Sequence, residues 1–259
     1  MHNSLISTGA FHYLNTYQAF LPNCMYYGGP ILKQINKMTL PEKRPMDNMD
    51  VGQMLPQEEE FAMACMFPNS FYHALLFPLH TRELADRYLF KNDSETGLKK
   101  RLDSYNYLIK KIHLHNKESR TILLKNPALT CRISELKKSF PTAKFIYLYR
   151  DEKSTLKSME HMFISFLKIN ALTEYNTTTL RKNLEYIYSE MKELYAKEKL
   201  QVNNDDIIEI NYSDLIASPN KTCIKLMKFI GCNPTDKQAE DLNDYLRSQE
   251  DYKTNFYSD

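Results

Sequence analysis

The most constraining feature of this sequence is an alternation of short apolar segments and amphipathic helical patterns in its centre. An apolar segment at 121–124 precedes a helical pattern at 129–139, and a second apolar segment at 144–149 precedes a helical pattern at 153–168. Short connections between alternating strands and helices are typical of parallel sheets, because each crossover helix returns the chain to the same edge. The sequence therefore predicts an α/β fold with a parallel sheet flanked by helices.

The remaining part of the chain after residue 168 extends this pattern. A long amphipathic helix is predicted at 179–198 and a third strand at 207–212. A helix at 221–230 is closed by Gly231, the residue type that most often follows a helix in the left-handed conformation. We therefore expect an α/β core over 121–259.

Upstream of this core, helical patterns dominate. They cover 1–7, 55–67, 82–90 and 98–115. A chain of 259 residues fits one large domain. We expect a single domain over 1–259, in which the region 1–120 is mostly helical.

Composition narrows the classes of function. The formal net charge is +2, so electrostatics alone favours neither a nucleic-acid binder nor a polybasic membrane binder. The six glycines form neither GxGxxG nor GxxxxGK. The sequence therefore contains neither of the standard glycine-rich phosphate cradles.

The cysteines and histidines indicate neither a disulfide framework nor a metal site. The five cysteines are widely spaced without CxxC, and the seven histidines are scattered without HExxH. Residues 1–13 contain neither the positive region nor the apolar run typical of a secretory signal, and no apolar run approaches the roughly 18 residues of a membrane span. We therefore expect a soluble, cytoplasmic protein with no bound metal.

The residues that end the predicted strands are the first candidates for a ligand site, because ligands of open parallel sheets bind outside the carboxyl ends of strands. The three strands end at Lys125, Arg150 and Tyr212, and Ser158 follows Arg150 on the next helix. An arginine fork beside a hydroxyl suits a phosphate. Either cation alone would be interpreted as a solvated charge, but the two together with Ser158 indicate a phosphate site.

These segments resemble the sulfotransferases that use 3′-phosphoadenosine 5′-phosphosulfate (PAPS) as sulfuryl donor. The resemblance rests on LLKNP at 123–127, FPTAKFI at 140–146, and Arg150 with Ser158. Further segments are similar to the larger microbial branch of the family, and they lie at 44–49, 56–61, 70–73, 212–215 with Pro219, and 252–255. The resemblance implies a P-loop-NTPase-like sulfotransferase fold with a largely helical acceptor-binding insertion.

The resemblance also implies roles in the donor site. Arg150 and Ser158 would hold the 3′-phosphate of the donor. Lys125 would lie near the bridging oxygen and stabilise charge on the leaving phosphate, in a transfer governed by positioning and electrostatics. Tyr212 and Lys253 would contact the nucleotide, although an edge tyrosine and a solvated lysine are the alternative interpretations.

A carboxylate or a histidine would accept the proton of the acceptor hydroxyl. The first candidates are Glu58, Glu59 and Glu60, with Glu60 preferred, and the next candidate is His73. Acids are also common in the first turn of a helix because they complement its dipole, and a core position explains His73 equally well. Helical phase does not choose between the three glutamates, because every face of the following turns is apolar.

One part of the family pattern does not occur in the sequence. Such sulfotransferases begin with a strand and a loop resembling Arg-Ser-Gly-Thr-Thr, which cradles the 5′-phosphosulfate. Here the resemblance starts at 1–7, which is similar to the helix after that loop. We expect the absence of this interior strand to expose neighbouring strand edges and apolar surface. We interpret Met1 as an internal methionine of a longer protein, and the alternative is a degenerate relative.

The predicted function is transfer of a sulfuryl group from PAPS to a hydroxyl, or an amine, of a small-molecule, lipid or carbohydrate acceptor. The product of the donor would be adenosine 3′,5′-bisphosphate. The alternative is a truncated or degenerate, non-catalytic nucleotide-binding protein, and the absence of GxxxxGK disfavours a kinase. The region between Gly9 and His115 is rich in apolar residues, which favours an acceptor with a substantial apolar part, but core packing explains the same residues.

Overall fold

A computed structural model describes residues 1–25, 34, 43–44, 50–90, 94–115 and 120–250 of the chain. The strands assigned in this part are β1 (Phe11–His12), β2 (Thr121–Ile122), β3 (Phe145–Tyr149) and β4 (Ile207–Asn211). β1 pairs with β2 and β3 pairs with β4, and both pairs are parallel. The predicted α/β fold with parallel strand pairing is therefore confirmed.

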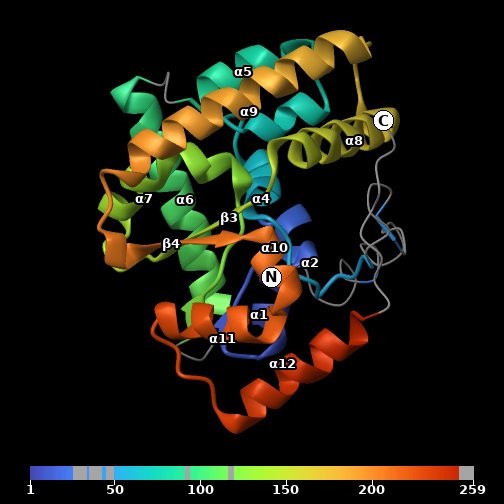
Figure 1. Cartoon of the computed structure of the whole chain (residues 1–259). Coiled ribbons are helices and arrows are strands. Elements are labelled where there is room, and N and C mark those ends of the chain that lie inside the picture. The colour runs from blue at the N-terminus through green and yellow to red at the C-terminus, as the bar shows by residue number, and fades with distance from the viewer. Residues whose placement is uncertain (26–33, 35–42, 45–49, 91–93, 116–119, 251–259) are drawn as a thin grey trace.

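A layer of helices covers one side of the β3–β4 pair. Figure 1 shows α5 (Thr81–Tyr88), α8 (Glu152–Asn170) and α9 (Thr177–Lys199) above these strands. The core of this layer is formed by buried side chains of α8 and α9 packed on α5 and η1 (Phe71–Leu75), including Phe163, Leu167, Leu180, Leu184 and Ile187. The predicted helices at 153–168 and 179–198 are thus found as α8 and α9, each extended by one or two residues at its ends.

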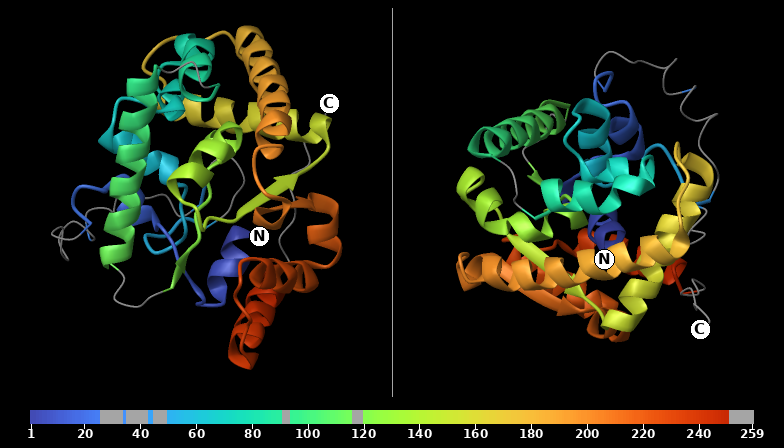
Figure 2. Two further views of the ribbon diagram at one scale, coloured as in Figure 1. Left: turned by 90° about the vertical axis from the view of Figure 1, so that its left-hand side faces the viewer. Right: turned by 90° about the horizontal axis from the view of Figure 1, so that it is seen from above.

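A second group of helices lies on the other side of the strands. It contains α1 (His2–Ser7), α10 (Tyr212–Ala217), α11 (Pro219–Phe229) and α12 (Asp236–Ser248) (Figure 2). Leu5 of α1 and Leu226 of α11 are buried in its core with Leu242 of α12. Gly231 follows α11 with φ of 87°, a left-handed conformation that glycine adopts without steric cost. The predicted end of this helix is therefore confirmed.

The third group of elements surrounds the β1–β2 pair. It consists of α2 (Thr16–Phe20), α4 (Glu59–Met66), α6 (Glu95–His115), η3 (Pro127–Arg132) and α7 (Ile133–Ser139). Of the two remaining short helices, η2 (Pro78–His80) contacts α5 and η1, and η4 (Asn204–Asp206) contacts β4. Leu14, Ala62 and Leu108 are fully buried between α2, α4 and α6. None of the helices in the described ranges combines the length and the apolarity that crossing a membrane requires.

The described strands form two separate pairs rather than one continuous sheet. β1 lies within the region predicted to be helical, and its two residues pair with β2. β3 is half-buried at its start and exposed at Leu148 and Tyr149, unlike a buried central strand. The residues at 121–125 and at 145–148 line one cavity. β2 and β3 each have one strand partner among the described residues, and residues of both line this cavity.

The helix predicted over 55–67 begins later than expected. α4 begins at Glu59, and Glu58 is its N-cap residue. Residues 56–57 remain extended because they pair with residues 14–15, through an antiparallel bridge and an N–H···O hydrogen bond of 2.9 Å. This tertiary pairing moves the three glutamates to the very start of the helix.

The packing between α8 and α9 leads to a prediction about stability. Leu184 is 1% exposed, so Leu184→Ala should lower the free energy of unfolding by about 2–5 kcal/mol through lost burial and a residual cavity. Leu200, 86% exposed at the end of α9, provides the matched control, and Leu200→Ala should cost less than about 0.5 kcal/mol. Urea unfolding followed by circular dichroism measures both changes. Equal losses at the two positions would contradict this assignment of the core.

Candidate active site

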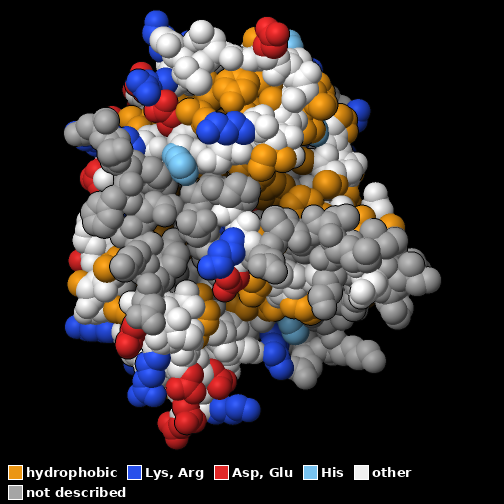
Figure 3. All heavy atoms as spheres, turned by 90° about the vertical axis from the view of Figure 1, so that its right-hand side faces the viewer, with side chains coloured by type: hydrophobic (Ala, Val, Ile, Leu, Met, Phe, Trp, Pro, Cys, Tyr) orange, Lys and Arg blue, Asp and Glu red, His pale blue; other side chains and the backbone are white. Residues whose placement is uncertain are grey.

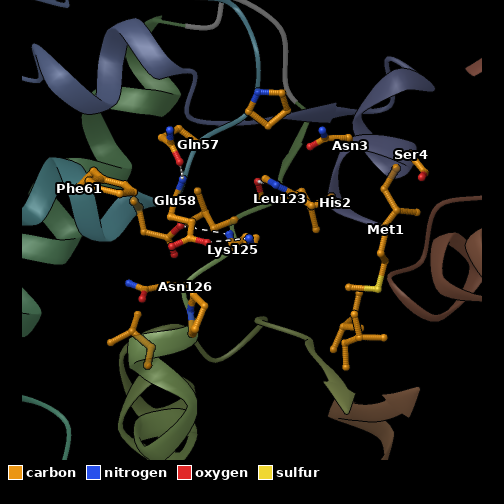
Figure 4. Close-up of a pocket in the computed structure, with 18 of the residues that line it drawn as sticks. Met1, His2, Asn3, Ser4, Gln57, Glu58, Phe61, Leu123, Lys125 and Asn126 are labelled. Carbon is orange, nitrogen blue, oxygen red and sulfur yellow. Dashed lines mark hydrogen bonds and ion pairs between the residues drawn. The ribbon is translucent and has the colours of Figure 1, made fainter. Parts of the chain in front are cut away.

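The candidate site lies where the start of α4 meets the end of β2. The chain that follows β2 brings Lys125 and Asn126 beside three consecutive glutamates. Glu58 contacts Lys125 Nζ, Glu59 accepts a hydrogen bond from the Lys125 backbone N–H, and Glu60 accepts one from the Asn126 side chain. Figure 4 shows Glu58 and Lys125 facing each other above Asn126. Each glutamate therefore contacts a different group of the same two residues.

Glu58 forms an ion pair with Lys125. The Oε1–Nζ distance is 2.6 Å, and the side chains are 16% and 48% exposed, respectively. The phenol of Tyr72 donates a short hydrogen bond to the other carboxylate oxygen. Burial by itself raises the pKa of Glu58, but the charge of Lys125 and these hydrogen bonds outweigh burial and lower the pKa below its ordinary value. Glu58 is therefore a carboxylate at neutral pH.

Glu59 is more deeply buried than Glu58, with 1% of its surface exposed. Its Oε1 accepts a hydrogen bond of 2.5 Å from the phenol of Tyr105, and its Oε2 accepts one of 3.1 Å from the backbone N–H of Lys125. Burial is the main cause that raises the pKa of Glu59 from 4.5 to about 7, although the hydrogen bond from Tyr105 opposes it. Glu59 therefore changes its protonation near neutral pH.

Glu60 is buried, and hydrogen bonds occupy both of its carboxylate oxygens. Oε1 accepts a hydrogen bond of 2.6 Å from the hydroxyl of Ser70, and Oε2 accepts one of 2.9 Å from the side-chain amide of Asn126. Asn126 in turn caps η3, because its side-chain oxygen accepts the N–H of Ala128 at 3.0 Å. Glu60 thus ties the loop after β2 to η1.

Glu58 and Lys125 lie in the wall of a cavity of about 1970 Å³. Ordinary small-molecule pockets measure roughly 300–1,000 Å³, so this cavity has room for more than one ligand of that size. Figure 3 shows hydrophobic side chains gathered mainly in the upper half of one face of the molecule. Exposed hydrophobic residues that also line the cavity include Phe20, Leu55 and Ile169. The cavity therefore combines a charged pair with an apolar wall.

The carboxyl ends of β3 and β4 bring a second pair of candidate residues together. Tyr149 lies opposite Asn211 in the strand register, so the next residues, Arg150 and Tyr212, are neighbours. The guanidinium carbon of Arg150 lies 4.8 Å from the centre of the Tyr212 ring, within cation–π range. Arg150 Nε also lies 3.5 Å from a carboxylate oxygen of Asp151. Tyr212 lines the same cavity as Lys125.

The remaining candidate residues are placed differently. Ser158 is half-buried on α8, within the two turns that follow β3. His73 is half-buried in η1, where its Nε2 lies 3.2 Å from the carbonyl oxygen of Ala64, and it is not among the residues that line the cavity. Lys253 falls outside the residues that the structure describes.

Three side chains in or beside the cavity were not selected from the sequence. Tyr72 and Tyr105 hold the carboxylates of Glu58 and Glu59 through their phenols. His2 lines the cavity with its Nε2 3.4 Å from the carbonyl oxygen of Leu123, and burial is the main cause that lowers its pKa to about 4. For Tyr105 the sequence did contain a signal, because its phenol lies among the apolar residues of a predicted helix. A buried phenol needs a hydrogen-bond partner, so this position could have been selected.

No group of three or more His, Cys, Asp or Glu side chains in the described ranges is arranged to hold a metal ion. The groups that the cavity offers to a ligand are instead an ammonium, a carboxylate and aromatic rings. This combination suits an anionic ligand beside an apolar one.

Comparison with known sequences identifies the family. The profile described as "Sulfotransferase family" matches residues 39–236, and the chain belongs to this family. The omega-hydroxy-beta-dihydromenaquinone-9 sulfotransferases Stf3 of Mycobacterium bovis and Mycobacterium tuberculosis are each 28% identical to it over 216 residues. The alignment covers 83% of this chain and 55% of each relative. The chain therefore spans about half the length of these curated relatives.

Solved structures show the same fold. Sulfotransferase STF9 from Mycobacterium avium superimposes with a TM-score of 0.76 at 15% identity, over 95% of this chain and 64% of the other. Sulfotransferase STF1 from Mycobacterium tuberculosis H37Rv superimposes with a TM-score of 0.72 at 17% identity, over 94% of this chain and 67% of the other. The predicted sulfotransferase fold is therefore confirmed.

The raised pKa of Glu59 predicts a pH-dependent stability. An unfolded glutamate ionises near 4.5, whereas folded Glu59 keeps its proton up to about pH 7. The folded state binds more protons between these values, so the stability contributed by the neutral carboxyl is present at acidic pH and is lost as the pH rises. Glu59→Gln, which stays neutral, should therefore gain stability relative to the unchanged chain between about pH 5 and pH 8, by up to roughly 3 kcal/mol.

Urea unfolding at several pH values measures this difference. The exposed Glu193 on α9 provides the control variant Glu193→Gln. A difference between Glu59→Gln and the unchanged chain that stays constant with pH would show that Glu59 ionises normally in the folded chain.

Proposed function

We propose that this chain is a sulfotransferase that transfers a sulfuryl group from PAPS to a hydroxyl, or an amine, and releases adenosine 3′,5′-bisphosphate. Its membership of the sulfotransferase family supports group transfer. The observation that carries the proposal is the pairing of Lys125 with Glu58 in the wall of a cavity that also reaches Tyr212. A cation for the leaving group and a base for the acceptor thus lie at one cavity.

The proposed transfer is a direct displacement at sulfur. The acceptor oxygen forms a bond to sulfur while the bond from sulfur to the bridging phosphate oxygen breaks. The electron pair of the broken bond stays on the leaving phosphate, where the ammonium of Lys125 stabilises the developing charge. The carboxylate of Glu58 takes the proton of the acceptor oxygen.

The contacts of the four candidate bases favour Glu58. It is ionised, and it faces the cavity beside Lys125. The carboxylate of Glu60, which sequence reasoning preferred, is buried and already accepts hydrogen bonds on both oxygens. Glu59 is almost fully buried, and His73 is turned toward the carbonyl oxygen of Ala64. The base is therefore reassigned from Glu60 to Glu58 in this proposal.

The proposed site for the 3′-phosphate lies beside β3 and β4. Arg150 would bind the phosphate through its guanidinium fork, and Ser158 on α8 would add a hydroxyl. Tyr212 supports this assignment because its ring lies beside Arg150 and lines the cavity. Lys253 would contribute a further contact with the nucleotide.

We propose an acceptor whose hydroxyl is attached to a large apolar body. The ring of Phe61 lies 5.4 Å from that of Phe20 and 6.3 Å from that of Phe166, and all three line the cavity. Such an aromatic wall binds apolar surface at little conformational cost. The relatives named as sulfotransferases of a hydroxylated dihydromenaquinone are consistent with a lipid acceptor. The acceptor contacts would come mainly from the region 1–120.

Binding of adenosine 3′,5′-bisphosphate tests the proposed phosphate site. Isothermal titration should show binding to the unchanged chain, and Arg150→Ala should weaken it about 10- to 100-fold, because a charge-assisted contact is worth roughly 1.5–3 kcal/mol. Arg87→Ala, an exposed arginine on α5, is the matched control and should leave the affinity unchanged. Equal affinities of the Arg150→Ala variant and the unchanged chain would remove Arg150 from the site.

Kinetic measurements test the proposed roles of Lys125 and Glu58. With PAPS and farnesol as probe substrates, Lys125→Ala should lower kcat about 10²–10³-fold, and Glu58→Gln about 10²–10⁴-fold. Neither change should alter the KM for PAPS more than severalfold. The exposed Lys192 on α9 supplies the control variant Lys192→Ala. Nucleotide binding without turnover in the unchanged chain would support the non-catalytic alternative.

A further inference from the structure

Lys125 is bound both at its side chain and at its backbone. Its ammonium pairs with Glu58, and its backbone N–H donates to Oε2 of Glu59. Almost half of its side chain is exposed, so packing alone does not fix the position of the ammonium. The direction of this flexible side chain therefore depends on where its backbone is held.

The strand pairing does not supply an acceptor for this backbone N–H. The N–H of Leu123, directly after β2, donates to the carbonyl of His12 at 2.8 Å. In a parallel ladder, Lys125 would donate next to residue 14. The carbonyl of Leu14 instead accepts the N–H of Gln57 at 2.9 Å. The carboxylate of Glu59 takes the place of the missing strand partner.

Glu59 also connects the backbone of Lys125 to the interior of the fold. It is the first residue of α4, and its other oxygen accepts the phenol of Tyr105 from α6. The titratable groups coupled to it are Glu58 before α4, Tyr72 of η1 and Tyr105 on α6, while Lys125 acts through its backbone N–H. Both Glu59 and Tyr105 are buried, so water competes little for these hydrogen bonds.

Packing alone does not account for a glutamate at this position. A buried carboxylate loses its hydration, and apolar side chains of similar volume often give equal or greater stability. Above a pH of about 7 Glu59 is ionised, and hydrogen bonds to a carboxylate are shorter and stronger than those between neutral groups. What Glu59 contributes is therefore a hydrogen bond that gives the backbone of Lys125 a defined position.

We propose that Glu59 is a positioning residue for Lys125: its carboxylate fixes the Lys125 backbone where the strand ladder ends, and so holds the ammonium beside Glu58 in the cavity. This inference rests on the proposed function of Lys125 in sulfuryl transfer. Glu58 and Glu59 then have separate tasks, because one pairs with the reacting end of the lysine and the other anchors its backbone.

The first test measures the Lys125 backbone directly. In the chain labelled with ¹⁵N-lysine, the Lys125 amide signal is assigned from its loss in Lys125→Arg. Glu59→Ala should shift this signal and increase its hydrogen exchange at least about tenfold, because its acceptor is gone. Glu59→Gln keeps an acceptor and should give a smaller change. Tyr105→Phe leaves Glu59 in place but frees one oxygen, and it serves as a second variant if Glu59→Ala does not fold.

The matched control is Glu198, another buried glutamate that accepts hydrogen bonds from the backbone N–H and hydroxyl of Ser134, at 3.0 and 2.6 Å. Glu198→Ala removes a comparable buried carboxylate from α9, far along the chain from Lys125. It should lower stability without changing the Lys125 amide. An unchanged Lys125 amide in both Glu59→Ala and Tyr105→Phe would overturn the proposal.

The second test measures turnover with PAPS and farnesol. Glu59→Ala should lower kcat about 10- to 100-fold with the KM for PAPS nearly unchanged, because a small misplacement of a catalytic group has effects of this size. On a logarithmic scale, the loss of kcat in Glu59→Gln should be at most half of the loss in Glu59→Ala. Equal losses of kcat in Glu59→Ala and Glu198→Ala would show a purely structural role and would overturn the proposal.

The two tests separate this inference from the proposed function. If the unchanged chain shows no turnover, the function of Lys125 is in doubt, but the amide measurements still decide whether Glu59 holds its backbone. If turnover is normal and depends on Lys125, while Glu59→Ala changes neither the amide nor kcat, the proposed function stands and the role of Glu59 is rejected.

Discussion

Three consecutive carboxylates lie at the start of α4, two of them buried, and the surrounding structure depends on a partner for each oxygen. Removing an unpaired carboxylate from water costs several kcal/mol, so such a cluster persists only with compensation. Here the loop after β2 supplies the ammonium and backbone N–H of Lys125 and the side-chain amide of Asn126. The hydroxyl of Ser70 and the phenol of Tyr72 come from the start of η1, and the phenol of Tyr105 comes from α6. The carboxylates therefore join elements that lie far apart in the sequence and set the position of Lys125.

The division of the strands into two pairs has a direct consequence for the candidate site. The cavity is lined by residues 121–125 in and after β2 and by residues 145–148 of β3. It therefore reaches Lys125 beside one strand pair and Tyr212 beside the other, with Glu58 from the start of α4. Charged groups and aromatic rings thus meet around one space, although they come from separate parts of the chain. In the proposed transfer, an anionic donor and an apolar acceptor would share this space and meet at Lys125.

The longer elements follow the local sequence closely. The periodicity of α8 and α9 and the apolar runs of β3 and β4 are sufficient to locate them, because each buries one face over many residues. β1 was not predicted, since a strand of two residues is defined by its pairing rather than by a pattern. The start of α4 was placed too early, because Pro56 suits a first turn and only its pairing with residues 14–15 keeps it extended.

The sequence by itself determined the α/β class, the positions of Lys125, Arg150 and Tyr212 after apolar strands, and the family. These features depend on local patterns, which each segment carries within itself. Only the tertiary structure decided the roles available to Glu58, Glu59 and Glu60. Their spacing in the sequence is uniform, but a carboxylate's pKa and contacts depend on burial and on partners from distant segments. The ion pair with Lys125, the phenol of Tyr105 and the amide of Asn126 distinguish them, and none of these contacts is local.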